Sequence, residues 1–373
     1  MTKKVFIFTA STGSGHNLAA QSLEDALSKS GFETRILDAF KVSSAVLDRL
    51  MSEGYKQLVE NAPRFYEQMY KKFNKQTPFR EHVFGRMSRL MNPELVPLIQ
   101  EEKPDLIIST HPFVTRLLGS IKEHAAIDIP VLAFVTDYKI HDVYIHKMIN
   151  AYVVGSEYTK KTMIDLGVSK DIIFPFGIPI RREFTENKAH ITENNSQIKG
   201  TVLLMAGSLG SKSMEKAFSA LMKIEKPIRL IVVCGNNEKV FRSIEFLKKV
   251  YQSKDKIVDI YGFVNNIPDL MDNSDIIITK PGGLTSTEAI MKNIPMIIPF
   301  CYPGQEEENA DYLVESGMAI KVKKIKDLTP TLDFLIENQY IIKEMSETMS
   351  EKSRLHSMEK TVNLCKALTH ADN

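Results

Sequence analysis

The sequence predicts an α/β protein with two Rossmann-like domains, each a parallel sheet covered by helices. Short β-branched apolar runs alternate with longer amphipathic stretches, a pattern typical of repeated strand–helix units. The pattern stops at a polar, turn-rich stretch after residue 182 and then begins again. The length of 373 residues is enough for two separate cores, at roughly 150 residues per domain. We therefore expect two domains of the same class.

Ten apolar runs bounded by turn residues are predicted to be buried parallel strands. They cover residues 4–9, 33–37, 105–109, 131–135, 151–154, 201–205, 228–233, 256–260, 275–279 and 295–299. We place the domains at 1–182 and 197–345, joined by a linker over 183–196. A charged helical tail over 346–373 is free to pack on either domain.

Composition places the chain among ordinary globular proteins. Hydrophobic residues make up 43% and charged residues 25%, which excludes disorder or a fibrous repeat. The net charge of +2 gives no bulk field to attract nucleic acid, and no apolar run reaches the ~20 residues that span a bilayer. The apolar start is too short for a secretory signal and reads as the first strand. Three widely spaced cysteines favour a reducing compartment over a disulfide framework or zinc site. We expect a cytoplasmic protein with, at most, peripheral membrane contact.

Residues 40–100 interrupt the strand–helix alternation and are predicted to be helical. Between Arg64 and Arg89, seven Lys/Arg stand against two Asp/Glu, with aromatic residues interleaved. The fold does not need an insertion here. From the sequence alone it is either a helix packed on the domain with a solvated basic face, or a surface for an anionic membrane.

The first predicted strand runs directly into a glycine-rich loop, Ser11-Thr-Gly-Ser-Gly-His16. Glycine allows the backbone to approach a ligand closely, and the N–H groups of a following helix suit an anion. A dinucleotide fingerprint would need a third glycine where Leu18 stands, although Asp38 has the position of its acidic residue. We expect His16 to stand in the cleft as a functional residue rather than to cap the helix.

Two polar clusters follow neighbouring strands of the second domain. The first is Lys280-Pro-Gly-Gly-Leu-Thr-Ser-Thr-Glu288, where Thr285 can cap the next helix and the amides suit a diphosphate. Glu288 lies one turn into that helix, within reach of sugar hydroxyls. The second cluster is Pro303-Gly-Gln-Glu-Glu-Glu-Asn309. Either cluster alone reads as turn chemistry, but together they define a ligand crevice of the α/β type.

Further segments are expected to line the crevice. Residues 207–213, Gly-Ser-Leu-Gly-Ser-Lys-Ser, lack the G-x-x-x-x-G-K-[ST] spacing of a phosphate loop, which excludes a P-loop ATPase or kinase. In the first domain, 109–112 and 136–142 follow predicted strands, and Asp137 can orient His16 and stabilise its imidazolium. No His-x-x-x-His pair occurs, so the histidines do not predict a metal site.

Taken in order along nearly the whole chain, these motifs resemble one family. It comprises the monogalactosyldiacylglycerol synthases and processive diacylglycerol glucosyltransferases, relatives of the lipid-linked N-acetylglucosaminyltransferase of peptidoglycan synthesis. The motifs that carry the resemblance are residues 13–16, 104–112, 136–137, 177–181, 261–264, 280–285 with Glu288, and 303–306 with Asn309.

The resemblance implies a GT-B fold, whose two parallel sheets face one another across a cleft. It implies transfer of glucose or galactose from a UDP-sugar to diacylglycerol, with inversion at the anomeric carbon. The uracil would lie by residues 262–264, the ribose by Glu288, and the diphosphate by Thr285 and the amides after Gly282. The candidate catalytic residues are His16, as general base, and Asp137. The candidate substrate-binding residues are Gly13, Gly15, Thr110, His111, Gly207, Ser208, Gly235, Phe263, Val264, Gly282, Gly283, Leu284, Thr285, Glu288, Gln305, Glu306 and Asn309.

Elementary chemistry agrees with this reaction. The acceptor hydroxyl must lose its proton as the anomeric C–O bond breaks, and a near-neutral histidine does this well. The leaving UDP gains negative charge, which amides at a helix N-terminus stabilise without a metal. No Asp-x-Asp sequence occurs. We therefore expect neither a metal nor a cofactor.

A lipid acceptor would explain the basic-aromatic insertion, with cations at anionic headgroups and aromatic rings in the interface. The expected partners are a UDP-sugar, diacylglycerol and an anionic membrane surface on the inner face of the cell membrane, and not nucleic acid. The residues expected to face the membrane are Arg64, Phe65, Tyr66, Tyr70, Lys71, Lys72, Phe73, Phe79, Arg80, Phe84 and Arg86.

Two alternatives remain open from the sequence. One keeps the fold but moves N-acetylglucosamine to a polyprenyl-linked peptidoglycan precursor. The other is a UDP-sugar-binding or nicotinamide-binding protein without transferase activity, although Leu18 argues against nicotinamide. The sequence does not distinguish glucose from galactose, and it does not give the number of sugars added, the oligomeric state or any activating lipid.

Overall fold

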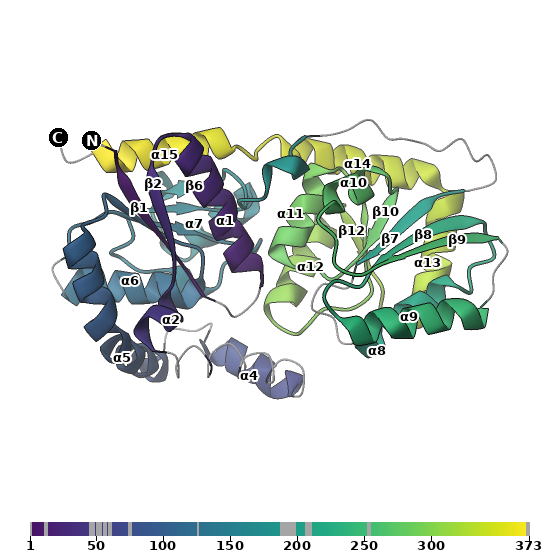
Figure 1. Ribbon diagram of the computed structural model, residues 1–373, viewed down its shortest axis with the longest axis horizontal. Helices are drawn as coiled ribbons and strands as arrows, with labels where there is room; N and C mark the ends of the chain where they lie inside the picture. Colours follow the sequence, from purple (N-terminus) through teal and green to yellow (C-terminus); the bar gives the residue numbers. More distant parts are fainter. Residues whose placement is uncertain are drawn as a thin grey trace. The chain divides into compact units, whose positions relative to one another are not determined.

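The chain forms two compact units, each built on a six-stranded parallel sheet (Figure 1). Unit 1 comprises Met1–Arg181, Tyr302–Glu308 and Leu355–Asn373, and unit 2 comprises Arg182–Cys301 and Asn309–Arg354. The computed structural model describes residues 2–10, 14–44, 62–73, 77–124, 127–186, 199–205, 211–251 and 255–370, together with Arg49, Gly54 and Leu58.

The sheet of unit 1 has the strand order β2-β1-β3-β4-β5-β6. Its strands are β1 (Lys4–Thr9), β2 (Glu33–Asp38), β3 (Leu106–Ser109), β4 (Val131–Phe134), β5 (Ala151–Val153) and β6 (Ile173–Phe174). Its helices are α1 (Ser14–Lys29), α2 (Ala39–Ser43), α4 (Pro63–Phe73), α5 (Pro78–Glu102), α6 (Pro112–His124), α7 (Glu157–Asp165) and α15 (Met358–His370). Short 3-10 helices cover Asp142–Tyr144 and Lys170–Ile172.

Both faces of the unit 1 sheet are buried. Val5 and Ile7 of β1 belong to a core shared with α1 and α15, whereas Phe6 and Phe8 belong to a core shared with α5 and α6. Successive side chains of a strand point to opposite faces, so one strand contributes to both cores. All four side chains are at most 1% exposed, and burying each one stabilises the unit by roughly 1.5–3 kcal/mol. Burial on both faces explains why the strands read as continuous apolar runs.

The sheet of unit 2 has the strand order β12-β11-β10-β7-β8-β9. Its strands are β7 (Thr201–Met205), β8 (Ile228–Val233), β9 (Lys256–Tyr261), β10 (Ile276–Ile278), β11 (Met296–Ile298) and β12 (Ala319–Lys321). Its helices are α8 (Ser211–Leu221), α9 (Glu238–Tyr251), α10 (Ile267–Asp272), α11 (Gly283–Met291), α13 (Leu328–Glu337) and α14 (Gln339–Ser353). Helix α12 (Gln305–Glu315) begins in the 302–308 segment of unit 1 and continues in unit 2. Short 3-10 helices cover Arg182–Phe184 and Ile325–Asp327.

The predicted fold class is confirmed. All ten predicted strands are present, and each of their ends lies within one residue of the prediction. The prediction missed β6 and β12, which have two and three residues and lie at the edges of the two sheets. The C-terminal region, expected as one tail, consists of α14 in unit 2 and α15 in unit 1. Most of the expected linker lies outside the described residues.

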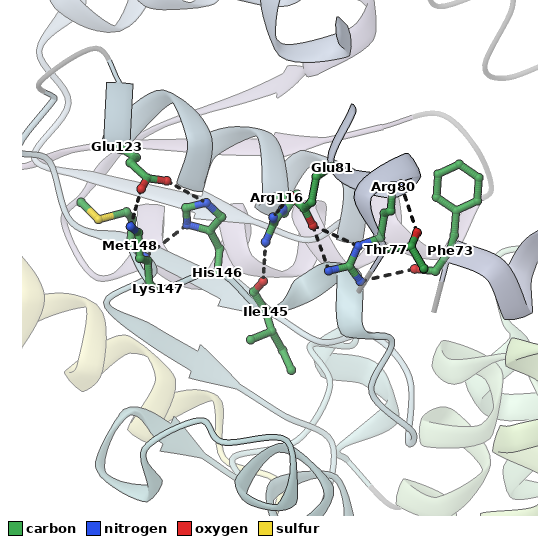
Figure 2. A network of polar contacts seen from close by, with 10 residues as sticks. All are labelled: Phe73, Thr77, Arg80, Glu81, Arg116, Glu123, Ile145, His146, Lys147 and Met148. Carbon is green, nitrogen blue, oxygen red and sulfur yellow. Dashed lines mark hydrogen bonds and ion pairs between the residues drawn. The ribbon is translucent and has the colours of Figure 1, made fainter. Parts of the chain in front are cut away.

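Most of the described residues of the insertion at 40–100 are helical, as expected, and a polar network ties the insertion to α6 (Figure 2). Thr77 caps α5 by accepting from the Arg80 backbone N–H at 3.2 Å. The Arg80 guanidinium donates to Glu81 at 3.2 Å and to the Phe73 carbonyl at 3.4 Å. Glu81 in turn accepts from Arg116 of α6, which also donates to the Ile145 carbonyl at 3.0 Å. The charges of α5 therefore anchor the insertion to the sheet domain.

Burial divides the aromatic and basic residues of the insertion into two groups. Phe65 and Phe79 are 60% and 50% exposed, and Leu90, absent from the prediction, is 68% exposed. Cations are exposed beside them, and the Lys72 Nζ lies 4.3 Å from the centre of the Phe79 ring. We define the basic-aromatic face as Arg64, Phe65, Lys72, Phe79, Arg86, Arg89 and Leu90.

The prediction that Tyr66, Tyr70, Arg80 and Phe84 face a membrane is wrong, because all four are buried. The two tyrosines cluster with Tyr302, Phe84 packs against Phe113, and Arg80 is held in the network above. Phe73 is partly buried, with its ring near Phe79 and Phe84. The side chain of Lys71 lies outside the described residues. None of the described helices is both long and apolar enough to cross a membrane.

Candidate active site

The candidate residues of unit 1 gather at one point of its sheet. The chain passes from β1 to β2 on one side and continues with β3 on the other, so the strand order reverses between β1 and β3. Ligands of open α/β sheets bind at such a reversal, outside the carboxyl ends of the strands. His16 follows β1, and Thr110 and His111 follow β3. A bond from the Thr110 N–H to the Phe8 carbonyl, 3.1 Å, holds the two strand ends together.

His16 lies in the first turn of α1 rather than in the loop before it, because the helix already begins at Ser14. Its Nδ1 lies 2.7 Å from the Thr110 carbonyl oxygen and 3.0 Å from Thr136 Oγ1. A carbonyl oxygen only accepts, so Nδ1 carries the proton and donates, which leaves the lone pair on Nε2. His16 is thereby in the protonation state that a general base needs.

The His16 ring packs edge-on against the buried His111 ring, with 4.6 Å between the ring centres. Loss of water around it lowers the pKa of His16 to about 4, although the bond to the Thr110 carbonyl opposes this shift. Burial, with the neighbouring His16, lowers the pKa of His111 well below its usual value. Both rings are therefore neutral at pH 7.

Asp137 has another partner than the one expected. Its Oδ2 accepts a hydrogen bond from the Gln305 side chain, and the contacts of the His16 ring are to Thr110, Thr136 and His111. We predicted that the Asp137 carboxylate orients His16. In the structure a main-chain carbonyl and a hydroxyl orient it instead. Glu306 lies in the same 302–308 segment as Gln305. Its carboxylate accepts from the Tyr302 backbone N–H at 3.1 Å and so stabilises the turn between these two residues.

In unit 2 the strand order reverses between β7 and β10. Helix α11 begins directly after β10, with Gly282 as its N-cap. Thr285 therefore lies inside the first turn and is not the cap, contrary to the prediction. Gly282 and Thr285 are partly exposed, whereas Gly283 and Leu284 are buried. The turn thus presents main-chain N–H groups and one hydroxyl at the place where an α/β sheet binds anions.

Buried polar side chains support this turn. Asn309 of α12 is 1% exposed and donates to the Pro281 carbonyl at 3.1 Å, which fixes the turn from behind. Glu288 is buried one turn further along α11. The Ser286 hydroxyl is also buried and finds no hydrogen-bond partner among the described residues. An unpaired buried hydroxyl is costly, so this end of α11 has capacity for a polar ligand.

Three other predicted residues follow strands β8 and β9 of unit 2. Phe263, just past β9, is 64% exposed, which is unusual for an aromatic side chain and suits stacking on a flat ring. Val264 beside it is partly exposed. Gly235, past β8, has φ +60°, a left-handed conformation that favours glycine.

Three predicted residues, Gly13, Gly207 and Ser208, lie outside the described residues, and Gly15 lies in the first turn of α1. Asp38, the acid that kept a dinucleotide fingerprint open, caps α2 by accepting from the backbone N–H groups of Phe40 and Lys41, at 3.1 and 3.2 Å. Its position is thus explained by helix capping. The contact of Thr136 with His16 was missed, because a threonine carries no sequence signal for such a role.

Three histidines that are buried or partly buried predict loss of stability in acid. Burial lowers the pKa of His16, His141 and His146 to about 4, from an ordinary value of 6.5. Below pH 6.5 the unfolded chain takes up protons that the folded chain does not, so stability is complete above pH 6.5 and falls towards pH 4. We expect the urea midpoint to fall steadily between pH 6.5 and 4.5. A midpoint that stays constant or rises over this range would contradict the burial of these rings.

Comparisons with known proteins cover both units of the chain. The family model for monogalactosyldiacylglycerol (MGDG) synthase matches residues 16–180, and the model for the glycosyltransferase family 28 C-terminal domain matches residues 201–365. A processive diacylglycerol β-glucosyltransferase of Bacillus mycoides is 31% identical over 375 residues, covering 99% of this chain and 95% of that protein. One of Bacillus pumilus is 28% identical over 360 residues, covering 95% and 92%.

Solved structures show the same fold at low identity. MurG of Acinetobacter baumannii has a TM-score of 0.67 and 16% identity, covering 98% of this chain and 99% of that one. HepE of Anabaena, solved with UDP and glucose, has a TM-score of 0.58 and 13% identity, with both chains covered completely.

Proposed function

Because this chain belongs to the family of monogalactosyldiacylglycerol synthases and processive diacylglycerol glucosyltransferases, we propose that it transfers glucose from UDP-glucose to diacylglycerol at a membrane surface. It is a UDP-sugar-dependent glycosyltransferase of glycolipid synthesis with the GT-B fold. The observation that carries the proposed reaction is the 2.7 Å contact of His16 Nδ1 with the Thr110 carbonyl oxygen, from which a neutral ring with its lone pair on Nε2 follows. The choice of glucose follows the names of the relatives in Bacillus.

His16 acts on the acceptor in this proposal. The acceptor hydroxyl oxygen attacks the anomeric carbon of the sugar and the bond from that carbon to the UDP oxygen breaks, which inverts the anomeric configuration. The hydroxyl proton moves to His16 Nε2. A neutral imidazole next to a reacting hydroxyl contributes roughly 10²–10⁴-fold to such a step.

The first turn of α11 acts on the leaving group. Negative charge develops on the diphosphate of UDP as the bond breaks. Main-chain N–H groups and the helix dipole stabilise this charge, with the hydroxyls of Thr285 and Ser286 at the same end of the helix. We propose that Phe263 stacks on the uracil and that Glu288 binds the ribose. These donors act on the charge directly, and we propose that the reaction needs no metal.

The test is incubation of the purified chain with diacylglycerol vesicles and UDP-glucose, UDP-galactose or UDP-N-acetylglucosamine, followed by mass spectrometry of the lipids. We expect glucosyl-diacylglycerol, formed equally well in the presence of EDTA. No glycolipid from any donor would refute the transferase. Transfer of N-acetylglucosamine to a polyprenyl-linked precursor would favour the alternative, which the MurG structure supports at the level of the fold alone.

The basic-aromatic face supports peripheral contact with the inner face of the cell membrane. On α5, Phe79, Arg86 and Leu90 are spaced i, i+7 and i+11, which places them on one side of the helix. Exposed rings and a leucine among cations are the composition of an interfacial helix. Each Lys or Arg near an anionic surface is worth about 1 kcal/mol.

We expect the double variant Lys72→Gln/Arg86→Gln to bind phosphatidylglycerol vesicles about 30-fold more weakly, because it loses about 2 kcal/mol of attraction. Co-sedimentation with vesicles measures this, and raising the salt concentration should weaken wild-type binding in the same way. The matched control is Lys239→Gln/Lys249→Gln on α9, which removes two exposed cations from unit 2. Equal losses in both double variants would show that bulk charge, and not this face, attracts the protein.

A further inference from the structure

Two oxygen atoms share the Nδ1 proton of His16. The Thr110 carbonyl lies 2.7 Å from Nδ1 and Thr136 Oγ1 lies 3.0 Å from it. One N–H shared between two acceptors is a three-centre hydrogen bond. The two acceptors come from different strand ends, one after β3 and the other after β4. Together they fix the plane of the ring as well as the position of its proton.

Thr136 is itself held in place. It is 4% exposed, and its Oγ1 lies 3.3 Å from the hydroxyl of Tyr144, which is 1% exposed. Tyr144 belongs to the 3-10 helix Asp142–Tyr144, and its ring lies in the core that contains Phe6 and Phe8. A hydroxyl in such surroundings has few alternative orientations. The Thr136 oxygen is therefore a fixed acceptor for the ring.

The arrangement decides which nitrogen of His16 can act as a base. Free histidine prefers the proton on Nε2, and in a protein the hydrogen bond at one nitrogen sets the state of the other. With the proton on Nδ1, the lone pair is on Nε2. A carboxylate would hold the same tautomer and also stabilise the imidazolium. Two neutral oxygens orient the ring while adding no negative charge.

We propose that Thr136 is a positioning residue, which together with the Thr110 carbonyl keeps the His16 proton on Nδ1 and leaves Nε2 free to accept the proton of a lipid hydroxyl. This inference rests on the proposed role of His16 as the general base. It predicts a tautomer that exists before any substrate binds, so it is measurable without the reaction.

The first test is ¹⁵N NMR of the full chain labelled in its histidine rings, at neutral pH and without substrate, with the His16 signals assigned from a His16→Gln sample. We expect the Nδ1–H tautomer alone for His16 in the wild type. In Thr136→Val the Thr110 carbonyl holds the proton by itself, so we expect a measurable minor share of the Nε2–H tautomer. Thr136→Ser, which keeps the hydroxyl, should restore the wild-type signals. A wild-type His16 with its proton on Nε2 would overturn the proposal, even if the Val variant did not fold.

The second test is steady-state kinetics with UDP-glucose and diacylglycerol. Thr136→Val should lower kcat about tenfold, the lower end of the loss seen when a partner that orients a metal-binding histidine is removed, and should leave KM for UDP-glucose within twofold. Thr136→Ser should recover most of kcat, and Tyr144→Phe should show a smaller loss of kcat. The control is Thr162→Val, which removes a hydroxyl bonded within α7.

The two tests separate the possible failures. If the wild type transfers no sugar, the proposed function fails while the tautomer result still decides the positioning role. If the wild type is active and Thr136→Val changes neither the tautomer nor kcat, the positioning role of Thr136 is refuted and the function stands.

Discussion

Replacing His16 by alanine should lower kcat for transfer from UDP-glucose by roughly 10²–10⁴-fold, the contribution expected of a general base. The residues that we propose to bind UDP belong to unit 2 and His16 belongs to unit 1, so KM for UDP-glucose should change by no more than about threefold. Steady-state kinetics over a range of UDP-glucose concentrations measure both quantities. His16→Gln should be equally inactive, because an amide accepts no proton at neutral pH.

The control for this prediction is His370→Ala, since that histidine is exposed at the end of α15. It should retain full activity. Thermal melting of each variant with and without UDP separates lost chemistry from lost folding or binding. Equal loss of kcat and of UDP affinity in His16→Ala would make this histidine a binding residue.

Replacing Lys292 by methionine should destabilise unit 2 by about 3–5 kcal/mol, because it leaves a carboxylate buried without its partner. The Lys292 Nζ lies 2.8 Å from Asp272 Oδ2 and 2.6 Å from the Glu186 carbonyl oxygen. The two side chains are 0% and 6% exposed. Urea unfolding of the full chain, followed by circular dichroism, measures the loss.

Two further variants make this prediction specific. Lys292→Met/Asp272→Leu removes both charges and should recover most of the loss, since an apolar pair of similar volume avoids the unpaired carboxylate. Arg242→Met breaks an ion pair with Glu238 whose side chains are 76% and 69% exposed, and it should cost at most about 0.5 kcal/mol. A single Lys292→Met variant as stable as Arg242→Met would show that Asp272 is not effectively buried.

The sequence predicted the strands accurately, but it did not predict which side chains of the insertion are exposed, and both results have physical reasons. Strands were found to within a residue because buried parallel strands must be apolar at nearly every position, and that requirement is visible along the chain. The prediction missed the edge strands β6 and β12, because two or three residues are too few to form a recognisable pattern. In the insertion, charge and aromatic content were read correctly, but they do not tell which side of a helix packs inward. Arg80 counts as a surface cation in the sequence and is completely buried in the structure.

The sequence by itself determined the fold class and the family, and it pointed to the segments that we propose for the site, because all of these depend on local patterns of apolar runs, glycines and polar loops. Only the tertiary structure decided how His16 is oriented. Its partners are a main-chain carbonyl, which every residue possesses, and a threonine 120 positions away. Neither partner can be recognised from the sequence. Both contact His16 because the strand order places β1, β3 and β4 next to one another in the sheet.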